Sequence, residues 1–461
     1  MFENVLGQAA AAQLSEDIGA GILAPAMLFS GPPASGKGTA ALELGRVISC
    51  EAGPRKALWG CQCPSCARHR LLIHPDLLCL GPRPFSAEIA ASAGAFLREA
   101  ASAGSSGGSG ASREIAASAS RILFIRAIRK LLARFSPVLW EDEPKKGKVA
   151  IAPMVNSLEE DIDELDALTV EENRDALVKH IEGMKKNAFK LESEGLSETI
   201  PIDRIRRAAW WGRLAPAGNG KLLIIENADR MQEEARNSLL KLLEEPPARL
   251  TLVLTTSRPG SLLPTMLSRL RPYRFSARDS SVEADVIRRV FRDNQEGGIG
   301  AYLDSFLPVS PDTLNALAAF FAASVAYKAA LLSKRRNRPI SDEVILLGKF
   351  SAPKAEAAGF GRPQGEIAAV TALVLEKAGK FEVRSLFSRF LCCLLEQVSL
   401  SQRNPGPEEN EASPFLPSVA YNEVWKKCAS WGETAVGLYR LSPALVLEKL
   451  FTSLSRGMAE L

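Results

Sequence analysis

The segment from residue 26 to residue 48 constrains the fold of this chain more than any other part of its sequence. Residues 26–30 have the apolar character of a short buried strand, and a helix is expected through Ile48. Between them, Gly31, Gly36 and Lys37 fit the pattern G-x-x-x-x-G-K. Glycines let backbone N–H groups turn inward to cradle phosphate, and the lysine adds positive charge. The segment therefore predicts a phosphate-binding loop between a strand and a helix.

The residue after this lysine departs from the usual motif. A Ser or Thr hydroxyl normally follows the lysine and binds Mg²⁺, whereas this chain has Gly38 and then Thr39. One residue is about 100° around a helix, so Thr39 cannot simply replace the missing hydroxyl. Binding of ATP with Mg²⁺ therefore stays open, and the alternative is a retained turn that only packs a strand on a helix.

A second apolar strand, residues 222–225, ends in an acidic residue. Glu226 at such a strand end can hold Mg²⁺ through the waters of the metal. The next position usually carries a Glu that orients the attacking water in ATPases, and here it is Asn227, which cannot take a proton. The chain is expected to keep the shape of an ATPase without intrinsic hydrolysis.

The order of the remaining segments predicts the fold class. Strands at residues 77–80, 252–256 and 272–275 alternate with helices, including one over residues 232–245, which indicates an α/β fold with a parallel sheet. Beyond Ser280 only helices are expected. The predicted division is a core at 1–277, a small helical domain at 278–345 and an all-α domain at 346–461.

An insertion is expected in the core at about residues 82–199. Ala, Ser and Gly dominate residues 91–118, and residues 104–110 have the composition of a flexible linker, so part of the insertion is predicted to be disordered. Residues 121–135 form an amphipathic basic helix that either grips DNA phosphates or packs on the core, and packing is the favoured reading. Its basic residues are Arg121, Arg126, Arg129, Lys130 and Arg134.

Four cysteines cluster between residues 50 and 66. They are Cys50, Cys61, Cys63 and Cys66. Clustered cysteines favour a metal over disulfides in a cytosolic chain, and four thiolates make a closed structural Zn²⁺ site. His69 is a spare ligand. The alternative is a set of free thiols in a small packed knob.

The bulk composition bounds the class of protein. The 461 residues are 46% hydrophobic and 24% charged, as in a soluble globular protein, and the net charge of +4 does not by itself imply nucleic acid. No apolar run is expected to span a membrane, and the N-terminus lacks a signal-peptide core. A cytoplasmic location is the default.

Several stretches together resemble the bacterial DNA polymerase III clamp loader, a complex of the AAA+ superfamily. The likeness covers residues 2–80 and 200–277. It is carried by Phe2-Glu3-Asn4-Val5-Leu6-Gly7-Gln8, by His74-Pro75-Asp76, by residues 237–247 with their Leu-Leu-Glu-Glu-Pro-Pro run, and by residues 262–269 ending in Ser268-Arg269. The resemblance implies a P-loop AAA+ core, a small helical lid domain at 278–345 and a helical collar at 346–461. It also implies a zinc module at the cysteines, although Gly60 stands where the family usually has a cysteine.

The departures from the motifs resemble one subunit type in particular. The paralogous gamma/tau subunits carry Gly-Lys-Thr or Gly-Lys-Ser and end the acidic strand in Asp-Glu, whereas this chain has Gly38 and Asn227. Delta-prime, the subunit that has largely given up ATP hydrolysis, is the better match. The resemblance implies gamma/tau and delta subunits, the sliding clamp and primed DNA as partners.

The family also implies a function for Arg269. In its Ser-Arg-Cys motif this arginine reaches the ATP site of a neighbouring subunit, and here the motif is Ser-Arg-Leu with Leu270. Two alternatives stay open. One is a gamma/tau-like ATP-hydrolysing motor, and the other is a nucleotide kinase, because Gly-Lys-Gly-Thr is normal in adenylate-kinase-like enzymes.

Overall fold

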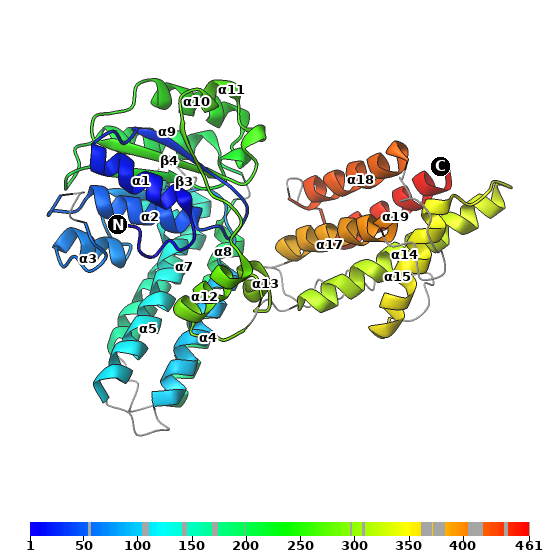
Figure 1. Cartoon of the computed structure of the whole chain (residues 1–461), viewed down its shortest axis with the longest axis horizontal. Coiled ribbons are helices and arrows are strands. Elements are labelled where there is room, and N and C mark those ends of the chain that lie inside the picture. Colours follow the sequence, from blue (N-terminus) through cyan, green and yellow to red (C-terminus); the bar gives the residue numbers. More distant parts are fainter. Residues whose placement is uncertain are drawn as a thin grey trace. The chain divides into compact units, whose positions relative to one another are not determined.

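A computed structural model describes most of the chain as two compact units, Met1–Phe306 and Leu307–Leu461 (Figure 1). Each unit is described by itself. The described residues are 1–53, 57–103, 110–140, 145–167, 174–197, 199–295, 297–306, 309–360, 371, 383–403, 418–437 and 441–460.

The first unit is built on a five-stranded parallel sheet. Its strands are β1 (Ala26–Ser30), β2 (Leu77–Leu80), β3 (Lys221–Ile225), β4 (Leu250–Thr256) and β5 (Arg271–Arg274). They lie in the order β2-β3-β4-β1-β5, so β1 sits between β4 and β5. Crossovers of this kind place helices on both faces, and every residue of β1 and β3 is accordingly buried. The predicted α/β class with a parallel sheet is confirmed.

Alternation along the strands divides the core of this unit into two faces. Met27 and Phe29 of β1 pack with residues of helices α1 (Ala9–Ala20) and α2 (Lys37–Ile48), whereas Leu28 packs on the opposite face. The elements of that second face include α9 (Ile202–Arg213), α10 (Glu233–Glu244) and α11 (Pro264–Leu267). The short elements α3 (Pro64–Arg70), η2 (Ala133–Phe135), η3 (Ala228–Arg230) and η4 (Pro259–Ser261) complete the connections.

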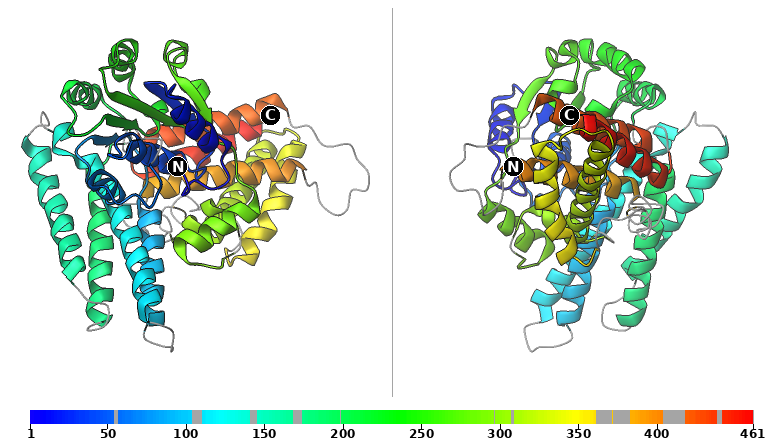
Figure 2. Two further views of the ribbon diagram at one scale, coloured as in Figure 1. Left: turned by 60° about the vertical axis from the view of Figure 1, so that its left-hand side comes forward. Right: turned by 90° about the vertical axis from the view of Figure 1, so that its right-hand side faces the viewer.

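The described residues of the insertion are mostly helical, and disorder in part of it stays a prediction. Its elements are α4 (Ser86–Ala103), α5 (Gly110–Leu132), α6 (Pro137–Trp140), α7 (Lys145–Ala167) and α8 (Arg174–Gly195). The long helices run side by side away from the sheet (Figure 2) and bury a core of their own that includes Phe96, Phe124, Leu158 and Ile181. Alanine is the best helix former, which accounts for the helix at the Ala-rich residues of α4. The predicted linker falls outside the described residues except for Gly110.

Two further helices pack on this insertion. Ile287 of α12 (Ser280–Phe291) and Tyr302 of α13 (Ile299–Asp304) share a small apolar cluster with Ala91 of α4. Both helices belong to the first unit, which extends to Phe306. Helices α12 and α13 follow the last strand, so their packing on α4 links the insertion to the core. A second link is the packing of η2 on β2.

The second unit is all helical in the residues described. Its helices are α14 (Pro311–Arg335), α15 (Asp342–Ala357), α17 (Val383–Arg403), α18 (Val419–Gly437) and α19 (Pro443–Glu460). They share one apolar core that contains Phe321, Phe390 and Leu450. Residue 345, where a domain boundary was expected, lies within α15, and the helix expected at 365–379 is outside the described residues apart from residue 371. The lid and collar domains stay predictions.

Helix α14 corrects one expectation about membranes. In the part of the chain that the structure describes, it is the one helix with the length and apolar composition to cross a bilayer, which the sequence analysis had excluded for every segment. Two thirds of its apolar window is nevertheless buried against protein. This burial is typical of a core helix in a helical unit, because most of its apolar surface packs on neighbouring helices.

Candidate functional site

The phosphate loop has the backbone conformation that the motif predicts. Gly36 caps α2 with φ of 93°, and a Cβ atom on Gly31 would lie 2.1 Å from the carbonyl oxygen of Phe275, so both positions require glycine. Lys37 is the first residue of α2. Its Nζ donates to the carbonyl oxygens of Gly31 at 2.8 Å and Pro32 at 2.5 Å. The lysine therefore lies folded against its own loop.

The charge of Lys37 is weakened by its surroundings. Burial lowers the pKa of its amine from 10.5 to about 8, and the nearby carboxylates of Glu226 and Asp229 offset only part of this effect. Thr39 lies two residues further along the same helix. An anion entering the loop would favour the protonated amine and raise its pKa again.

Glu226 lies directly against the first turn of α2. It follows β3, and its carboxylate is 8% exposed. A Cβ atom built on Gly38 would come within 2.7 Å of the Glu226 Oε1 atom, which is closer than such atoms approach in proteins. A side chain at position 38 would displace the carboxylate. With Glu226 in this position, there is no room for the Ser or Thr that usually follows the lysine.

Two arginines hold the carboxylate of Glu226. Arg134 of η2, which is 6% exposed, donates from NH2 to Oε2, and the NH1 atom of Arg83 lies 3.7 Å from Oε1. Burial alone would raise the pKa of Glu226, but Arg134 and then Arg83 outweigh it and lower the pKa. The carboxylate is ionised and its charge is balanced by protein groups.

A second carboxylate extends this ion network into the insertion. Glu88 of α4 pairs with Arg83 and with Lys130 of α5. The pKa of Glu88 is lowered to about 2, since the charges of Lys130 and Arg83 outweigh the effect of burial. The network therefore joins the end of β3 to both α4 and α5.

The basic residues of α5 that the structure describes contact the protein itself. Arg126 donates to the carbonyl of Arg70, and Arg129 donates to the carbonyl of Leu71 at 3.1 Å. Together with the pairs of Lys130 and Arg134, these bonds confirm the packing interpretation of the basic helix. Sequence analysis did not find the bond from Arg134 to Glu226, because no spacing signal links residues so far apart in the chain.

The side chain and the backbone N–H of Asn227 both form hydrogen bonds within the protein. Its backbone is left-handed, with φ of 50°, a conformation that asparagine tolerates better than most residues. Its Nδ2 atom donates to the carbonyl of Pro82 at 2.6 Å, and its backbone N–H donates to Thr255 Oγ1 at 3.3 Å. The neighbouring hydroxyl of Thr256 donates to Asp229 at 2.6 Å. The threonine pair of β4 thus bonds to the residues that follow β3.

Arg269 lies at the surface just after α11. Its side chain is 36% exposed and forms an ion pair with Glu244 of α10, with NH2 2.9 Å from Oε1. Its NH1 also donates to the carbonyl of Thr265 at 2.8 Å. Leu270, which replaces the cysteine of the family motif, is buried in the core. The guanidinium is therefore held at the surface by an exposed pair of the kind that contributes little to stability.

The four cysteines come together from three elements. Cys50 follows α2, Cys61 and Cys63 lie in the loop before α3, and Cys66 is in the first turn of α3. Their sulfur atoms all lie within 4.8 Å of one another. Cys50 Sγ is 3.7 Å from Cys61 Sγ and 4.0 Å from Cys63 Sγ. Tetrahedral Zn²⁺ with bonds of about 2.3 Å needs sulfur separations of about 3.8 Å, so the residues fit the metal.

The surroundings favour the thiolate at Cys63, whereas burial raises the pKa of Cys50 and of Cys66. Arg46, a buried residue paired with Glu43, donates from NH1 to Cys66 Sγ at 3.2 Å. Burial would raise the pKa of Cys63, but the N–H groups of Cys66 and Glu51 outweigh it and lower the pKa to about 7. The loop absorbs the shifted spacing at Gly60.

His69 is not among these ligands. Its ring is buried and stacks on His74 with centroids 4.1 Å apart. The group of ligand atoms close enough to share a metal at this site contains the four cysteines and not His69. The spare ligand expected at His69 is therefore not brought to the site.

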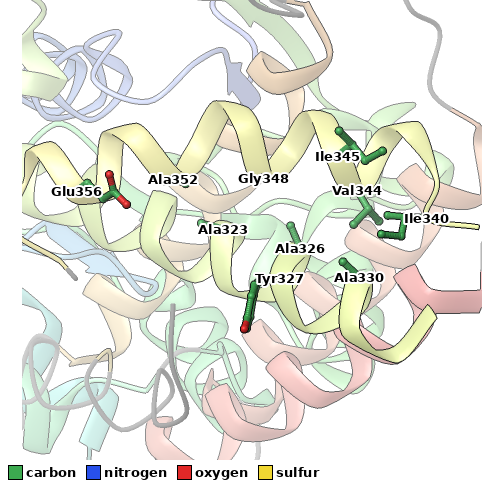
Figure 3. A pocket seen from close by; sticks show the side chains of 10 residues that line it. All are labelled: Ala323, Ala326, Tyr327, Ala330, Ile340, Val344, Ile345, Gly348, Ala352 and Glu356. Atoms are coloured by element: carbon green, nitrogen blue, oxygen red, sulfur yellow. The ribbon is translucent and has the colours of Figure 1, made fainter. Parts of the chain in front are cut away.

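The second unit contains a groove of about 470 Å³ between α14 and α15 (Figure 3). Its lining is apolar apart from the Tyr327 hydroxyl and the Glu356 carboxylate, and none of the lining residues is positively charged. A phosphate site needs donors or positive charge. The groove therefore does not compete with the phosphate loop as the nucleotide site.

The fold and the site together define a P-loop α/β core of the AAA+ class. A phosphate loop follows β1, an interior strand of a parallel sheet, and the acidic residue after β3 faces it. The class predicted from the sequence is confirmed.

Comparisons with known proteins find similarity to DNA polymerase III subunits over part of the chain. The family described as DNA polymerase III, delta subunit, matches residues 154–279, about a quarter of the chain. This range contains the second of the two predicted stretches of likeness and part of the insertion.

Individual relatives carry the name DNA polymerase III subunit delta-prime. The protein of Pseudomonas aeruginosa is 36% identical over 88 residues, which is 19% of this chain and 27% of that protein. The protein of Bacillus subtilis is 43% identical over 72 residues, which is 14% of this chain and 22% of that protein. The protein of Escherichia coli is 33% identical over 90 residues, which is 19% of this chain and 27% of that protein. The matches span about a quarter of the length of these relatives, and they confirm the predicted resemblance to delta-prime.

A solved structure of a DNA polymerase III gamma subunit-related protein from Thermotoga maritima is also similar. It aligns with 57% of this chain and 81% of its own length at 19% identity, with a TM-score of 0.24. A score this low supports no argument about the arrangement of the chain, and the fold class rests on the sheet and the loop.

Proposed function

We propose that this chain is a delta-prime-like subunit of the replicative DNA polymerase III clamp loader, and that it does not hydrolyse ATP itself. The observation that carries the proposal is the state of Asn227. An amide stands where a catalytic carboxylate is needed, and its Nδ2 is bonded to Pro82 at 2.6 Å, so it is neither basic nor free to orient a water molecule. Similarity to delta-prime subunits supports the same conclusion.

The proposed partners are the gamma/tau and delta subunits, the sliding clamp, and primed DNA held by the assembled complex. The helical second unit would act as the collar that holds subunits together. A clamp loader acts on DNA in the bacterial cytoplasm, which is the proposed location. Zn²⁺ on the four cysteines would be structural, because a site closed by four protein ligands leaves no position for water.

Arg269 is proposed as an arginine finger for a neighbouring subunit. A guanidinium is always charged and planar, and it stabilises negative charge that develops on a transferred phosphoryl group. Its surface position and its weak pair with Glu244 leave it available to a partner.

A gamma/tau-like motor is the second candidate because Gly31, Gly36 and Lys37 are retained, and the segment from Leu239 to Arg269 argues against a nucleotide kinase. The test is reconstitution. Gamma/tau, delta, clamp and primed DNA from the same organism are mixed with and without this chain, and ATP turnover and clamp loading are measured. The proposal predicts that loading needs the chain. Equal loading without the chain would contradict it.

A further inference from the structure

The insertion places the positively charged side chain of Arg134 where a nucleotide site of this class holds its metal. Glu226 is the acidic strand end through which a P-loop site would bind Mg²⁺. Its Oε2 accepts from Arg134, its Oε1 faces Arg83, and the guanidinium of Arg134 is almost completely buried. Neither the family match nor the sequence motifs assign this arrangement.

We infer that Arg134 is the resident counter-ion of Glu226 and that this phosphate-loop site excludes Mg²⁺. Three observations support the inference. Gly38 supplies no hydroxyl ligand, the Glu226 carboxylate occupies the space beside Gly38, and both carboxylate oxygens face arginines. Mg²⁺ requires near-octahedral oxygen ligands and retains several waters, and the buried pair leaves no ligand for them on Glu226.

Electrostatics works in the same direction. A divalent cation near Glu226 would lie beside the guanidinium groups of Arg134 and Arg83, with Lys130 close behind in the same network. Like charges in a buried site repel strongly because water screens them poorly. Mg²⁺ could bind to Glu226 only if the guanidinium of Arg134 moved away from the carboxylate.

This inference deepens the proposed function, because it gives a second reason why the site does not hydrolyse ATP. The two claims can fail separately. Mg²⁺ binding without turnover would overturn the inference alone, and clamp loading that does not need this chain would overturn the proposed function alone.

The experiment compares the effect of Mg²⁺ on the thermal unfolding of the full chain and of Arg134→Gln. Mg²⁺ is added at matched ionic strength to zinc-loaded protein, and it is omitted rather than chelated, since a chelator would also remove Zn²⁺. The wild type should show no shift in Tm. In Arg134→Gln the uncompensated Glu226 should take the metal, and Tm should rise by several degrees. Arg129→Gln is the matched control, because Arg129 lies in α5 directly before η2 and bonds to Leu71 instead.

Two results would overturn the inference. One is a rise in the wild-type Tm with Mg²⁺ that Glu226→Gln abolishes, and the other is a folded Arg134→Gln that does not respond to Mg²⁺. If Arg134→Gln does not fold, the inference is tested on the wild type. Its affinity for a fluorescent ADP analogue is then measured with and without Mg²⁺. A change of less than threefold on adding Mg²⁺, or no binding in either buffer, supports the inference. A larger gain that Glu226→Gln removes overturns it.

Discussion

The guanidinium of Arg134 donates to the carboxylate of Glu226, and this bond joins the helical insertion to the acidic end of the central sheet. Both side chains are almost completely buried. The bond gives the insertion a direct effect on the phosphate-loop site, because Glu226 in turn lies against Gly38. A residue of the insertion is therefore part of the phosphate-loop site of the core.

Removing one partner of this pair should destabilise the first unit strongly. Arg134→Ala leaves Glu226 buried without its main counter-ion, and breaking a buried pair in this way costs about 3–5 kcal/mol. Replacing both partners by Arg134→Met with Glu226→Gln removes the buried charges and should recover much of the loss. Denaturant unfolding of the three proteins measures the effect. Equal losses in the single and double variants would show that the pair itself contributes nothing.

Changing Arg269 should affect ATP turnover by a reconstituted clamp loader without affecting the stability of this chain. Arg269→Ala removes only an exposed ion pair, so its unfolding free energy should change by less than about 0.5 kcal/mol. Turnover at the neighbouring site should fall, and Arg269→Lys should not restore it, because a lysine lacks the planar fork.

Glu244→Ala is the control for this variant. It removes the surface partner of Arg269 and leaves the guanidinium in place, so turnover should stay normal. If Arg269→Ala and Glu244→Ala behaved alike, the ion pair and not the arginine finger would explain the effect.

Loss of a cysteine ligand should destabilise the first unit and release the metal. Cys63→Ser should lower the unfolding free energy by at least about 3 kcal/mol, a part of the about 10–16 kcal/mol that structural Zn²⁺ contributes in isolated peptides. Metal analysis should find zinc in the wild type and little in the variant. Cys392→Ser, at an exposed position of α17, should change neither quantity. A wild type without zinc would favour the alternative of free thiols.

The amine of Lys37 should titrate with a midpoint near pH 8. Burial disfavours its charged form in the folded state, so the proton leaves at lower pH than from an ordinary lysine, whose pKa is about 10.4. Between these two values the unfolded chain binds more protons, and this group therefore makes folding more favourable as pH rises. Competitive acetylation followed by mass spectrometry gives the midpoint, with a lysine peptide as reference. A midpoint above 10 would contradict the burial of this amine.

Much of the core was predictable because its signals are local. The strand at Ala26–Ser30, the loop glycines and the helix after Lys37 follow one another in sequence, so periodicity and motif suffice to place them. The close approach of the four cysteines was predictable in the same way, since all four lie within the short stretch around α3.

The rest was not predictable because it depends on contacts between distant segments. Arg134 and Glu226 are separated by most of the insertion, and nothing in either segment signals the other. Helix α4 was not predicted from its Ala-rich composition, yet its residues Ile89 and Phe96 pack against neighbouring helices. His69 was a plausible ligand by spacing, but its ring turns to His74. Tertiary packing decided each of these cases.

The central claim is that this phosphate-loop core does not hydrolyse ATP, and steady-state ATP turnover by the purified chain tests it most directly. The account predicts no turnover above the level of Lys37→Ala, with Mg²⁺ present, because Asn227 is no base and Arg134 holds Glu226. Steady turnover that Lys37→Ala abolishes would contradict the account and would identify the chain as a motor subunit or a kinase.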